Sequence, residues 1–154
     1  NANAPDNTVY PTNINLACSF DTLMAYKIAR QTAKEMRAMN MHWTFNPNVE
    51  VARDARWGRV GETYGEDPYL VTLLGVQSVK GYQGDLNGNE DVLACIKHFV
   101  GGSEPINGTN GSPTDLSERK LREVFFRTEL PVGFLPHRWY LSAVPGKHHQ
   151  DPYL

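Results

Sequence analysis

Two spacings of apolar residues alternate along most of the chain. Short apolar or aromatic runs, typical of strands, occur at residues 14–18, 42–49 and 92–96. Runs with apolar residues three and four positions apart, typical of amphipathic helices, begin near residues 22, 68 and 118 and end near 39, 79 and 126. The pattern therefore predicts three units in which a strand is followed by a helix.

Capping residues mark the starts of the predicted helices. Asp21 precedes the first helix, and Asp67 followed by Pro68 places an acidic N-cap and a first-turn proline at the second. The sequence Asp115-Leu116-Ser117-Glu118 gives the same signal for a third helix that ends at about Phe126. Each strand is thus separated from the next by a helix, as in a crossover connection.

The run Val-Leu-Ala-Cys-Ile at residues 92–96 is apolar on both faces, as in a parallel sheet that is buried. Repeated βα units with helical crossovers predict an α/β fold, either doubly wound or part of a barrel. Three units do not close a (β/α)8 barrel, which takes about 250 residues. The pattern by itself leaves both architectures open.

Residues 127–154 break this pattern. Four prolines and two glycines interrupt every helix or strand longer than about six residues, so we expect this segment to be irregular. The segment also contains His137, His148 and His149. The adjacent pair lacks the helical i, i+4 spacing of zinc ligands and no cysteine lies nearby, so we expect no metal site there.

Composition excludes two classes of partner. The chain has 154 residues and a net charge of −2, so it lacks the basic field of a nucleic-acid-binding protein. No apolar run approaches the roughly 20 residues that span a bilayer, so no membrane partner is expected. The sequence opens without an initiator methionine or a signal-peptide pattern, and we interpret it as the interior of a longer protein.

Cysteine and asparagine residues each allow two interpretations. Cys18 and Cys95 lie in apolar runs, which permits one disulfide but fits two buried free thiols better. Asn107 and Asn110 begin formal glycosylation sequences, yet each precedes a glycine, as in tight turns. We favour the turn interpretation because nothing else in the sequence indicates secretion.

Polar residues gather where the predicted strands end. Ligands of parallel βα folds bind at the carboxyl ends of the strands. Residues 53–59 and 62–67 follow the second strand, and Lys97 and His98 follow the third. Arginine, lysine and histidine side chains at one rim would donate hydrogen bonds to hydroxyl-rich or anionic ligands.

Simple structural roles account for some of these residues. We expect Arg53, Asp54 and Arg56 to form a local ion-pair network, and Glu66 and Asp67 to cap a helix. The Lys-His pair at residues 97–98 differs, because two polar residues in an apolar strand are unfavourable to bury without partners. That pair is the strongest candidate for function in the sequence.

Four stretches of the chain resemble a known family. Residues 8–17, 45–59, 62–70 and 94–99 closely resemble the N-terminal barrel domain of glycoside hydrolase family 3, the β-glucosidase and exo-glucanase group. The resemblance covers about residues 8–126. It implies an α/β fold of parallel βα units that form part of an incomplete TIM (β/α)8 barrel, with residues 1–126 as the family domain.

The resemblance also implies a function and a set of site residues. The family hydrolyses O-glycosyl bonds of β-linked oligosaccharides and glucosides with retention, and no metal or organic cofactor is implied. By position, Arg59, Lys97 and His98 would hold hydroxyls of the sugar in the −1 subsite, and Phe45 would line the same subsite. Four further residues of the motifs are expected to shape the loop: Arg53, Asp54, Trp57 and Glu62.

The catalytic carboxylates of the family have no counterpart in this sequence. The nucleophile is an aspartate in a Ser-Asp-Trp-like element, and the acid/base belongs to a following domain; neither is found here. We therefore expect a fragment that supplies part of the sugar-binding site and is inactive by itself. The alternative is a non-catalytic carbohydrate-binding remnant that uses the same residues.

The end of the chain departs from the family. Residues 127–154 lack the hydrophobic strand and the Tyr-Asn or His-Asn element with which the family continues. We interpret them as sequence from outside the family, as a frameshift or a wrongly assigned gene end would produce. A strand in this segment that pairs in parallel with residues 92–99 would contradict that interpretation.

Two expectations concern the surroundings of the protein. A partial sheet has unpaired edges on both sides, which predicts self-association of the chain. The family resemblance points to a periplasmic or extracellular parent protein that acts on a carbohydrate substrate.

Overall fold

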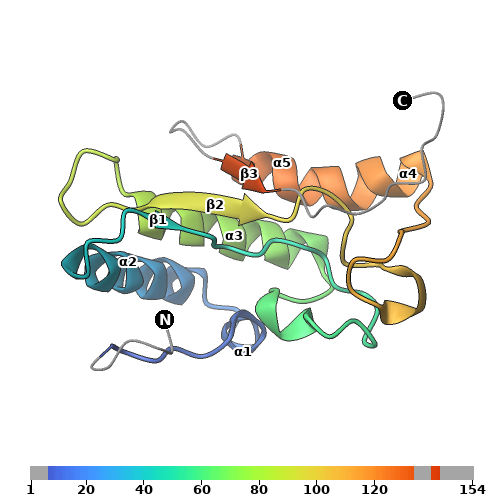
Figure 1. The fold of residues 1–154 in the computed structure, drawn as a ribbon, viewed down its shortest axis with the longest axis horizontal. Coiled ribbons are helices and arrows are strands. Elements are labelled where there is room, and N and C mark those ends of the chain that lie inside the picture. Colours follow the sequence, from blue (N-terminus) through green and yellow to red (C-terminus); the bar gives the residue numbers. More distant parts are fainter. Residues whose placement is uncertain (1–6, 134–139, 143–154) are drawn as a thin grey trace.

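A parallel sheet of three short strands runs through the middle of the structure (Figure 1). The computed structural model describes residues 7–133 and 140–142. The strands are β1 (Trp43–Thr44), β2 (Leu93–Lys97) and β3 (Tyr140–Ser142), in the order β1-β2-β3. Both pairs of neighbours are parallel. The chain is therefore an α/β protein whose parallel βα units form part of a TIM (β/α)8 barrel.

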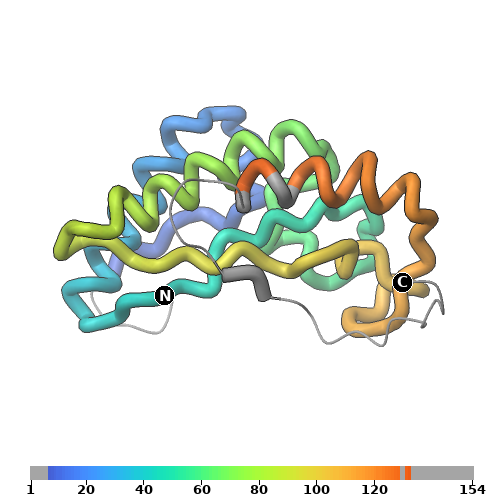
Figure 2. The backbone as a smooth tube through the Cα atoms, turned by 90° about the horizontal axis from the view of Figure 1, so that it is seen from above, coloured from blue at the N-terminus to red at the C-terminus, as the bar shows by residue number. Residues whose placement is uncertain are grey.

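The three long helical segments lie on one side of the sheet (Figure 2). They contain α2 (Thr22–Ala38), α3 (Pro68–Gln83) and α5 (Arg127–Gly133). The shorter elements are α1 (Asn13–Ala17), the 3-10 turns η1 (Val60–Glu62) and η2 (Ile106–Gly108), α4 (Glu118–Lys120) and the π-helical turn η3 (Leu121–Phe126). A sheet covered on one face only has its other face free for side chains of the barrel interior.

The helix starts are those that the sequence predicts. Asp21 accepts a hydrogen bond from the Met24 amide at 2.9 Å, and Asp67 accepts one from the Leu70 amide at 2.7 Å. The Ser117 hydroxyl accepts one from a backbone amide of the first turn of α4 at 3.2 Å. Side-chain caps of this kind satisfy amides that have no partner inside the helix, which fixes where each helix begins.

The core lies between the sheet and α3. Ala94 and Ile96 lie on one face of β2 and pack against Val71, Leu74 and Val79 of α3, all nearly inaccessible to solvent. The remaining members of this cluster come from several elements: Leu16, Ala17, Ala25, Val49, Tyr64 and Val132. One shared core therefore joins α1, α2, α3, α5 and the sheet.

The prediction of a strand at residues 14–18 is wrong. This segment is α1, in which the Leu16 amide donates to the Thr12 carbonyl at 2.9 Å. A five-residue apolar run has no periodicity that separates a strand from one helical turn, and burial of Leu16 and Ala17 in the core decides for the helix. Cys18 and Cys95 are free thiols, as predicted. Only Cys95 is buried, because the helical turn leaves Cys18 exposed.

The two other predicted strands shift or shorten. The aromatic run at residues 42–49 is a strand only over β1, because Pro47 has no amide hydrogen to extend the ladder. Beyond it, Asn48 forms an isolated parallel bridge with Lys97. β2 begins at Leu93 rather than Val92, whose side chain is buried beside α2.

Part of the segment expected to be irregular is regular. The helical run continues past Phe126 into α5 despite Pro131, because Phe125 and Val132 are both fully buried and their packing outweighs one lost hydrogen bond. β3 pairs in parallel with β2, which contradicts the interpretation that the chain leaves the barrel pattern after Phe126. His137, His148 and His149 lie outside the described residues.

Among the described residues, no helix combines the length and the apolar character that crossing a bilayer requires.

Replacement of Gly81 by alanine should destabilise the protein. A Cβ there would lie 2.5 Å from the Tyr26 carbonyl oxygen and 2.7 Å from the Ala29 Cβ of α2. Forcing α2 and α3 apart should lower the free energy of unfolding by roughly 1–3 kcal/mol. Urea denaturation followed by tryptophan fluorescence measures this change.

The matched control is Gly61→Ala, since nothing lies within 4 Å of the position that its Cβ would occupy. Its stability should stay unchanged or rise slightly. Equal stability of the two variants would show that α2 and α3 are not in close contact at Gly81.

Candidate functional site

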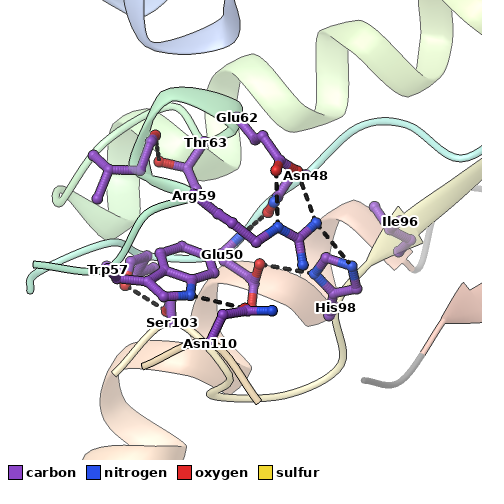
Figure 3. Close-up of polar contacts among 12 residues, drawn as sticks. Asn48, Glu50, Trp57, Arg59, Glu62, Thr63, Ile96, His98, Ser103 and Asn110 are labelled. Carbon is purple, nitrogen blue, oxygen red and sulfur yellow. Dashed lines mark hydrogen bonds and ion pairs between the residues drawn. The ribbon is translucent and has the colours of Figure 1, made fainter. Parts of the chain in front are cut away.

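Three segments of the chain, residues 47–50, residues 59–62 and residues 97–98, meet at the carboxyl end of β2. The Lys97 amide donates to the Pro47 carbonyl at 3.2 Å, and the Val49 amide donates to the Lys97 carbonyl at 2.9 Å. This pairing places residues 48–50 beside Lys97 and His98. The loop that contains Arg59 and Glu62 closes over the same point (Figure 3).

Arg59 is held on three sides. Its guanidinium donates two hydrogen bonds to the Glu62 carboxylate, each of 2.8 Å, and its Nη2 lies 3.4 Å from His98 Nε2 (Figure 3). The Trp57 ring lies beside it, with 5.9 Å between the Arg59 Cζ atom and the ring centroid. A bidentate pair and an aromatic neighbour fix the orientation of a side chain that is otherwise flexible.

His98 forms its shorter contact with Glu50. The Nδ1 atom lies 2.8 Å from Glu50 Oε2, and the Glu50 side chain is only 1% exposed. The peptide bond between Lys97 and His98 is cis. The two ring nitrogens of His98 thus face a carboxylate on one side and a guanidinium on the other.

Glu50 and Asn48 are site residues that the sequence analysis missed. Both are fully buried, and the Asn48 side-chain oxygen accepts a hydrogen bond from the Glu50 amide at 3.0 Å. The signal was the alternation Asn-Val-Glu-Val at residues 48–51, in which Val49 and Val51 enter the core. Polar residues that alternate with buried valines point to the opposite side of an extended segment.

The charges of the cluster reinforce one another. The hydrogen bonds from Arg59 lower the pKa of the Glu62 carboxyl, and the positive charge of Lys97 adds a smaller effect; partial burial opposes both. The bond to Glu62, with help from the charges of Glu62 and Glu50, raises the pKa of Arg59. Arg59 therefore stays a cation and Glu62 stays ionised at neutral pH.

The structure brings three of the four predicted binding residues together. Arg59 and His98 are in contact, and Lys97 is close enough for its charge to act on Glu62. Phe45 instead lies against the ring of Trp43, with 4.6 Å between the ring centroids, and is 56% exposed. Thr44 between them is buried, so both rings lie on the face of the sheet away from the helices.

The local roles expected of the loop residues are found in part. Arg56 donates to both oxygens of Asp54, at 3.0 and 2.8 Å, which lowers the pKa of Asp54 to about 2. Among the described residues Arg53 does not join this ion pair and instead donates to the Glu66 backbone carbonyl at 3.4 Å, and Asp67 rather than Glu66 caps α3. These contacts shape the loop without involving the cluster around Arg59.

Trp57 joins this loop to residues 101–114. Its ring is 2% exposed, and its Nε1 donates to the Asn110 side-chain oxygen at 3.0 Å. Asn107 has a φ of 59° within η2, and the Ser112 amide closes a turn onto Thr109 at 3.0 Å. The turn interpretation of Asn107 and Asn110 is confirmed by this geometry.

The site has the character of a ligand site built from hydrogen-bond donors. Among the described residues, no group of three histidine, cysteine or acidic side chains is arranged to hold a metal ion. The Arg59 guanidinium and the His98 imidazole converge at the carboxyl end of β2, and the charge of Lys97 acts on the same cluster. The fold is thus a portion of an α/β barrel, and the cluster lies at the strand ends, where barrels of this kind bind their ligands.

The family follows from comparison with known sequences. Residues 3–128 match the N-terminal domain of glycosyl hydrolase family 3, so the chain belongs to this family. The match ends within two residues of Phe126, and the domain boundary there remains a prediction.

Named relatives and solved structures agree with this assignment. A β-xylosidase of Formosa agariphila is 46% identical over an alignment that covers 94% of this chain and 20% of the relative. A periplasmic β-glucosidase of Salmonella typhimurium is 34% identical over 74% of this chain and 15% of the relative. A mutant β-glucosidase of Listeria innocua, crystallised with laminaribiose, superposes with a TM-score of 0.85 and 36% identity over 89% of this chain and 20% of that one. The chain thus spans about a fifth of these relatives or less.

The Glu62→Gln variant should lose stability in a pH-dependent way. Arg59 lowers the pKa of Glu62 below its ordinary value of 4.5, so the ion pair stabilises the fold above that pH and is lost as the pH falls through the lowered pKa. Glu62 is 45% exposed, so water screens the pair and the expected effect is no more than about 1 kcal/mol.

Urea denaturation of both proteins at about pH 7 and about pH 3 checks this. The variant should be less stable at the higher pH, and the difference should shrink at the lower one. The control is Glu123→Gln, whose ion pair with Arg119 is exposed on both sides and should matter little. A difference that grows on acidification would contradict the pKa direction.

Proposed function

We propose that this chain is the sugar-binding part of a retaining β-glycosidase that hydrolyses O-glycosyl bonds of β-glucosides and β-linked oligosaccharides. Arg59, Lys97 and His98 contact hydroxyls of the sugar in the −1 subsite, and Phe45 adds an apolar wall. The names of the relatives support the reaction class, since they include β-glucosidases and β-xylosidases. Listeria innocua β-glucosidase structures with laminaribiose and glucose support a carbohydrate ligand.

The convergence of Arg59 and His98, which are 39 residues apart in sequence, is the observation that carries this proposal. Lys97 adds a second cation beside them. Fixed cationic and imidazole groups orient a sugar ring through hydrogen bonds to its hydroxyls, which positions the anomeric carbon for attack through an oxocarbenium-like transition state. A site of this composition suits a neutral, hydroxyl-rich substrate.

The nucleophile and the acid/base belong, in this proposal, to parts of the protein outside this chain. A retaining glycosidase needs two carboxyl groups about 5–5.5 Å apart on either side of the scissile bond. The two carboxylates of the cluster are already engaged, Glu62 by Arg59 and Glu50 by His98. The chain alone should therefore give no turnover.

The names of the same relatives support a proposal for where the parent protein is located. The Salmonella relative is named as periplasmic and a Dictyostelium relative as lysosomal. The periplasm and the lysosome are both compartments outside the cytoplasm in which oligosaccharides are cleaved. We place the parent protein in the periplasm or outside the cell.

The proposal is tested by restoring the missing part of the enzyme. Residues 7–126 replace the matching segment of the Formosa agariphila β-xylosidase, and the chimera is assayed with p-nitrophenyl β-xyloside and β-glucoside. Lys97→Met removes the charge at that position, and Arg59→Lys keeps the charge but removes the planar guanidinium. Each should lower kcat/KM on the order of 10- to 100-fold. Arg56→Ala is the control, because Arg56 is exposed and its side chain pairs only with Asp54 among the described residues.

Unchanged kcat/KM in the Arg59 and Lys97 variants would contradict the assignment of the site. Turnover by the 154-residue chain alone would contradict the placement of the catalytic carboxylates. Saturable binding of glucose by the chain, combined with a chimera in which the site residues have no effect, would favour a carbohydrate-binding remnant.

The isolated chain should self-associate. Among the described strands β1 lies at one side of the sheet, and it carries Trp43 and the adjoining Phe45, which are 47% and 56% exposed. Strands at the side of a sheet and exposed aromatic side chains both favour contact with a second copy. Sedimentation velocity should show a weight-average mass that rises with concentration. Trp43→Ser should reduce this rise, whereas Tyr69→Ser, on the exposed start of α3, should leave it unchanged. A single monomeric species at all concentrations would contradict the expectation.

A further inference from the structure

Glu50 is a buried carboxylate with one side-chain hydrogen-bond partner in the described part of the chain. Its Oε2 contacts His98 Nδ1, and its Oε1 has no hydrogen-bond partner among residues 7–133 and 140–142. Removing a carboxylate from water is unfavourable unless it is paired and fully hydrogen-bonded. Stability of the fold alone therefore does not account for a glutamate at this position.

The partners of His98 define where its proton lies. A guanidinium only donates hydrogen bonds, so Arg59 Nη2 requires a lone pair on His98 Nε2. A carboxylate only accepts, so Glu50 Oε2 requires a hydrogen on His98 Nδ1. Both contacts are satisfied together by one neutral form of the ring, with hydrogen on Nδ1 and none on Nε2.

We infer that Glu50 is a positioning residue that holds His98 in the Nδ1-protonated form, so that the lone pair on Nε2 accepts from Arg59 and helps to orient its guanidinium. The inference rests on the proposed function, because the orientation of Arg59 matters for the sugar that Arg59 would bind. The hydrogen bond that one ring nitrogen of a histidine makes determines whether the other nitrogen carries hydrogen.

The consequence is a guanidinium that meets an acceptor on two sides, the Glu62 carboxylate and His98 Nε2. A guanidinium only donates hydrogen bonds, so each of these acceptors fixes one of its edges. Glu50 therefore acts on the orientation of Arg59 through the histidine ring.

The backbone around Glu50 is rigid enough to position a partner. Val49 and Val51 on either side are fully buried, and the Ser103 hydroxyl donates to the Val51 carbonyl at 2.8 Å. The Glu50 amide is itself held by Asn48. A positioning residue acts through such fixed support, since its own rotamer must not change when the ligand binds.

The first experiment uses the chain as it is. A long-range ¹H–¹⁵N NMR spectrum at about pH 8 reports which ring nitrogen carries hydrogen. The His98 signals are assigned as those lost in His98→Gln. We expect hydrogen on Nδ1 alone; hydrogen on Nε2, on both nitrogens, or averaged between them would overturn the inference.

The second experiment asks whether Glu50 sets this form. In Glu50→Gln the neutral amide can either accept from Nδ1 or donate to it, so the share of the Nε2-protonated form in the His98 signal should rise above its share in the original protein, and the contact with Arg59 limits that rise. Glu104→Gln is the matched control, since Glu104 is also a largely buried glutamate with an unpartnered Oε1, but its ion pair is with Lys120. An unchanged His98 spectrum in Glu50→Gln would overturn the inference.

Kinetics of the chimera separate positioning from general support of the fold. Glu50→Gln should lower kcat/KM on the order of 10- to 100-fold, as loss of an outer partner of a functional histidine does. In a His98→Gln background the same change should have little further effect. An equal loss in both backgrounds would show that Glu50 acts without His98 and would overturn the inference.

The two proposals fail separately. If Arg59, Lys97 and His98 variants keep full activity while the spectrum shows hydrogen on Nδ1 alone, the proposed function fails and the effect of Glu50 on the ring stands. If those variants lose activity while Glu50→Gln leaves both the spectrum and the rate unchanged, the role of Glu50 fails and the proposed function stands.

Discussion

The parallel pairing at the end of β2 is the constraint on which the site depends. It aligns the backbone of residues 47–49 with Lys97 through two hydrogen bonds of 3.2 and 2.9 Å. Without this alignment Glu50 would not meet His98, and Arg59 would lack the histidine as its second neighbour. Backbone hydrogen bonds between buried extended segments are directional and strong because water is excluded. They therefore bring the side chains of the paired segments within hydrogen-bonding distance of one another.

The packing behind the sheet keeps this alignment in place. The valines that alternate with Asn48 and Glu50 enter the same core as Ile96 and the apolar face of α3. A slip of one residue in the register would turn these valines toward the polar cluster and place Asn48 and Glu50 in the apolar core. The hydrophobic core and the polar site therefore select the same register, each from its own face of the extended segment.

Local signals in the sequence account for the helices and for the central strand. Aspartate caps define the starts of α2 and α3, and an all-apolar run defines β2 to within one residue. The short run at residues 14–18 carried no period, and its helical form depends on the core that it enters. α5 contains a proline that the sequence alone marks as a break, whereas burial of Val132 keeps the helix intact.

The sequence predicted those site residues that lie in a recognisable motif. It did not predict residues that join the site only through a contact in the folded structure. Arg59, Lys97 and His98 stand out as polar residues at strand ends, and the structure joins them. Glu50 lies 48 residues from His98, and the alternation at residues 48–51 indicates a polar face but not the contact with His98, which depends on the pairing with β2. Phe45 shows the converse, since its position in a motif does not reveal that it packs on Trp43.

Two glycines of α3 set how closely its neighbours approach. A side chain at Gly75 would meet Val49 at 2.8 Å, and one at Gly81 would meet the backbone of α2. The spacing of the helical layer is thus set on one face of the sheet, while the loops that hold the polar cluster lie at the end of the strands. Substitutions in those loops therefore leave the spacing of the helical layer unchanged, so the polar cluster and the scaffold can diverge separately.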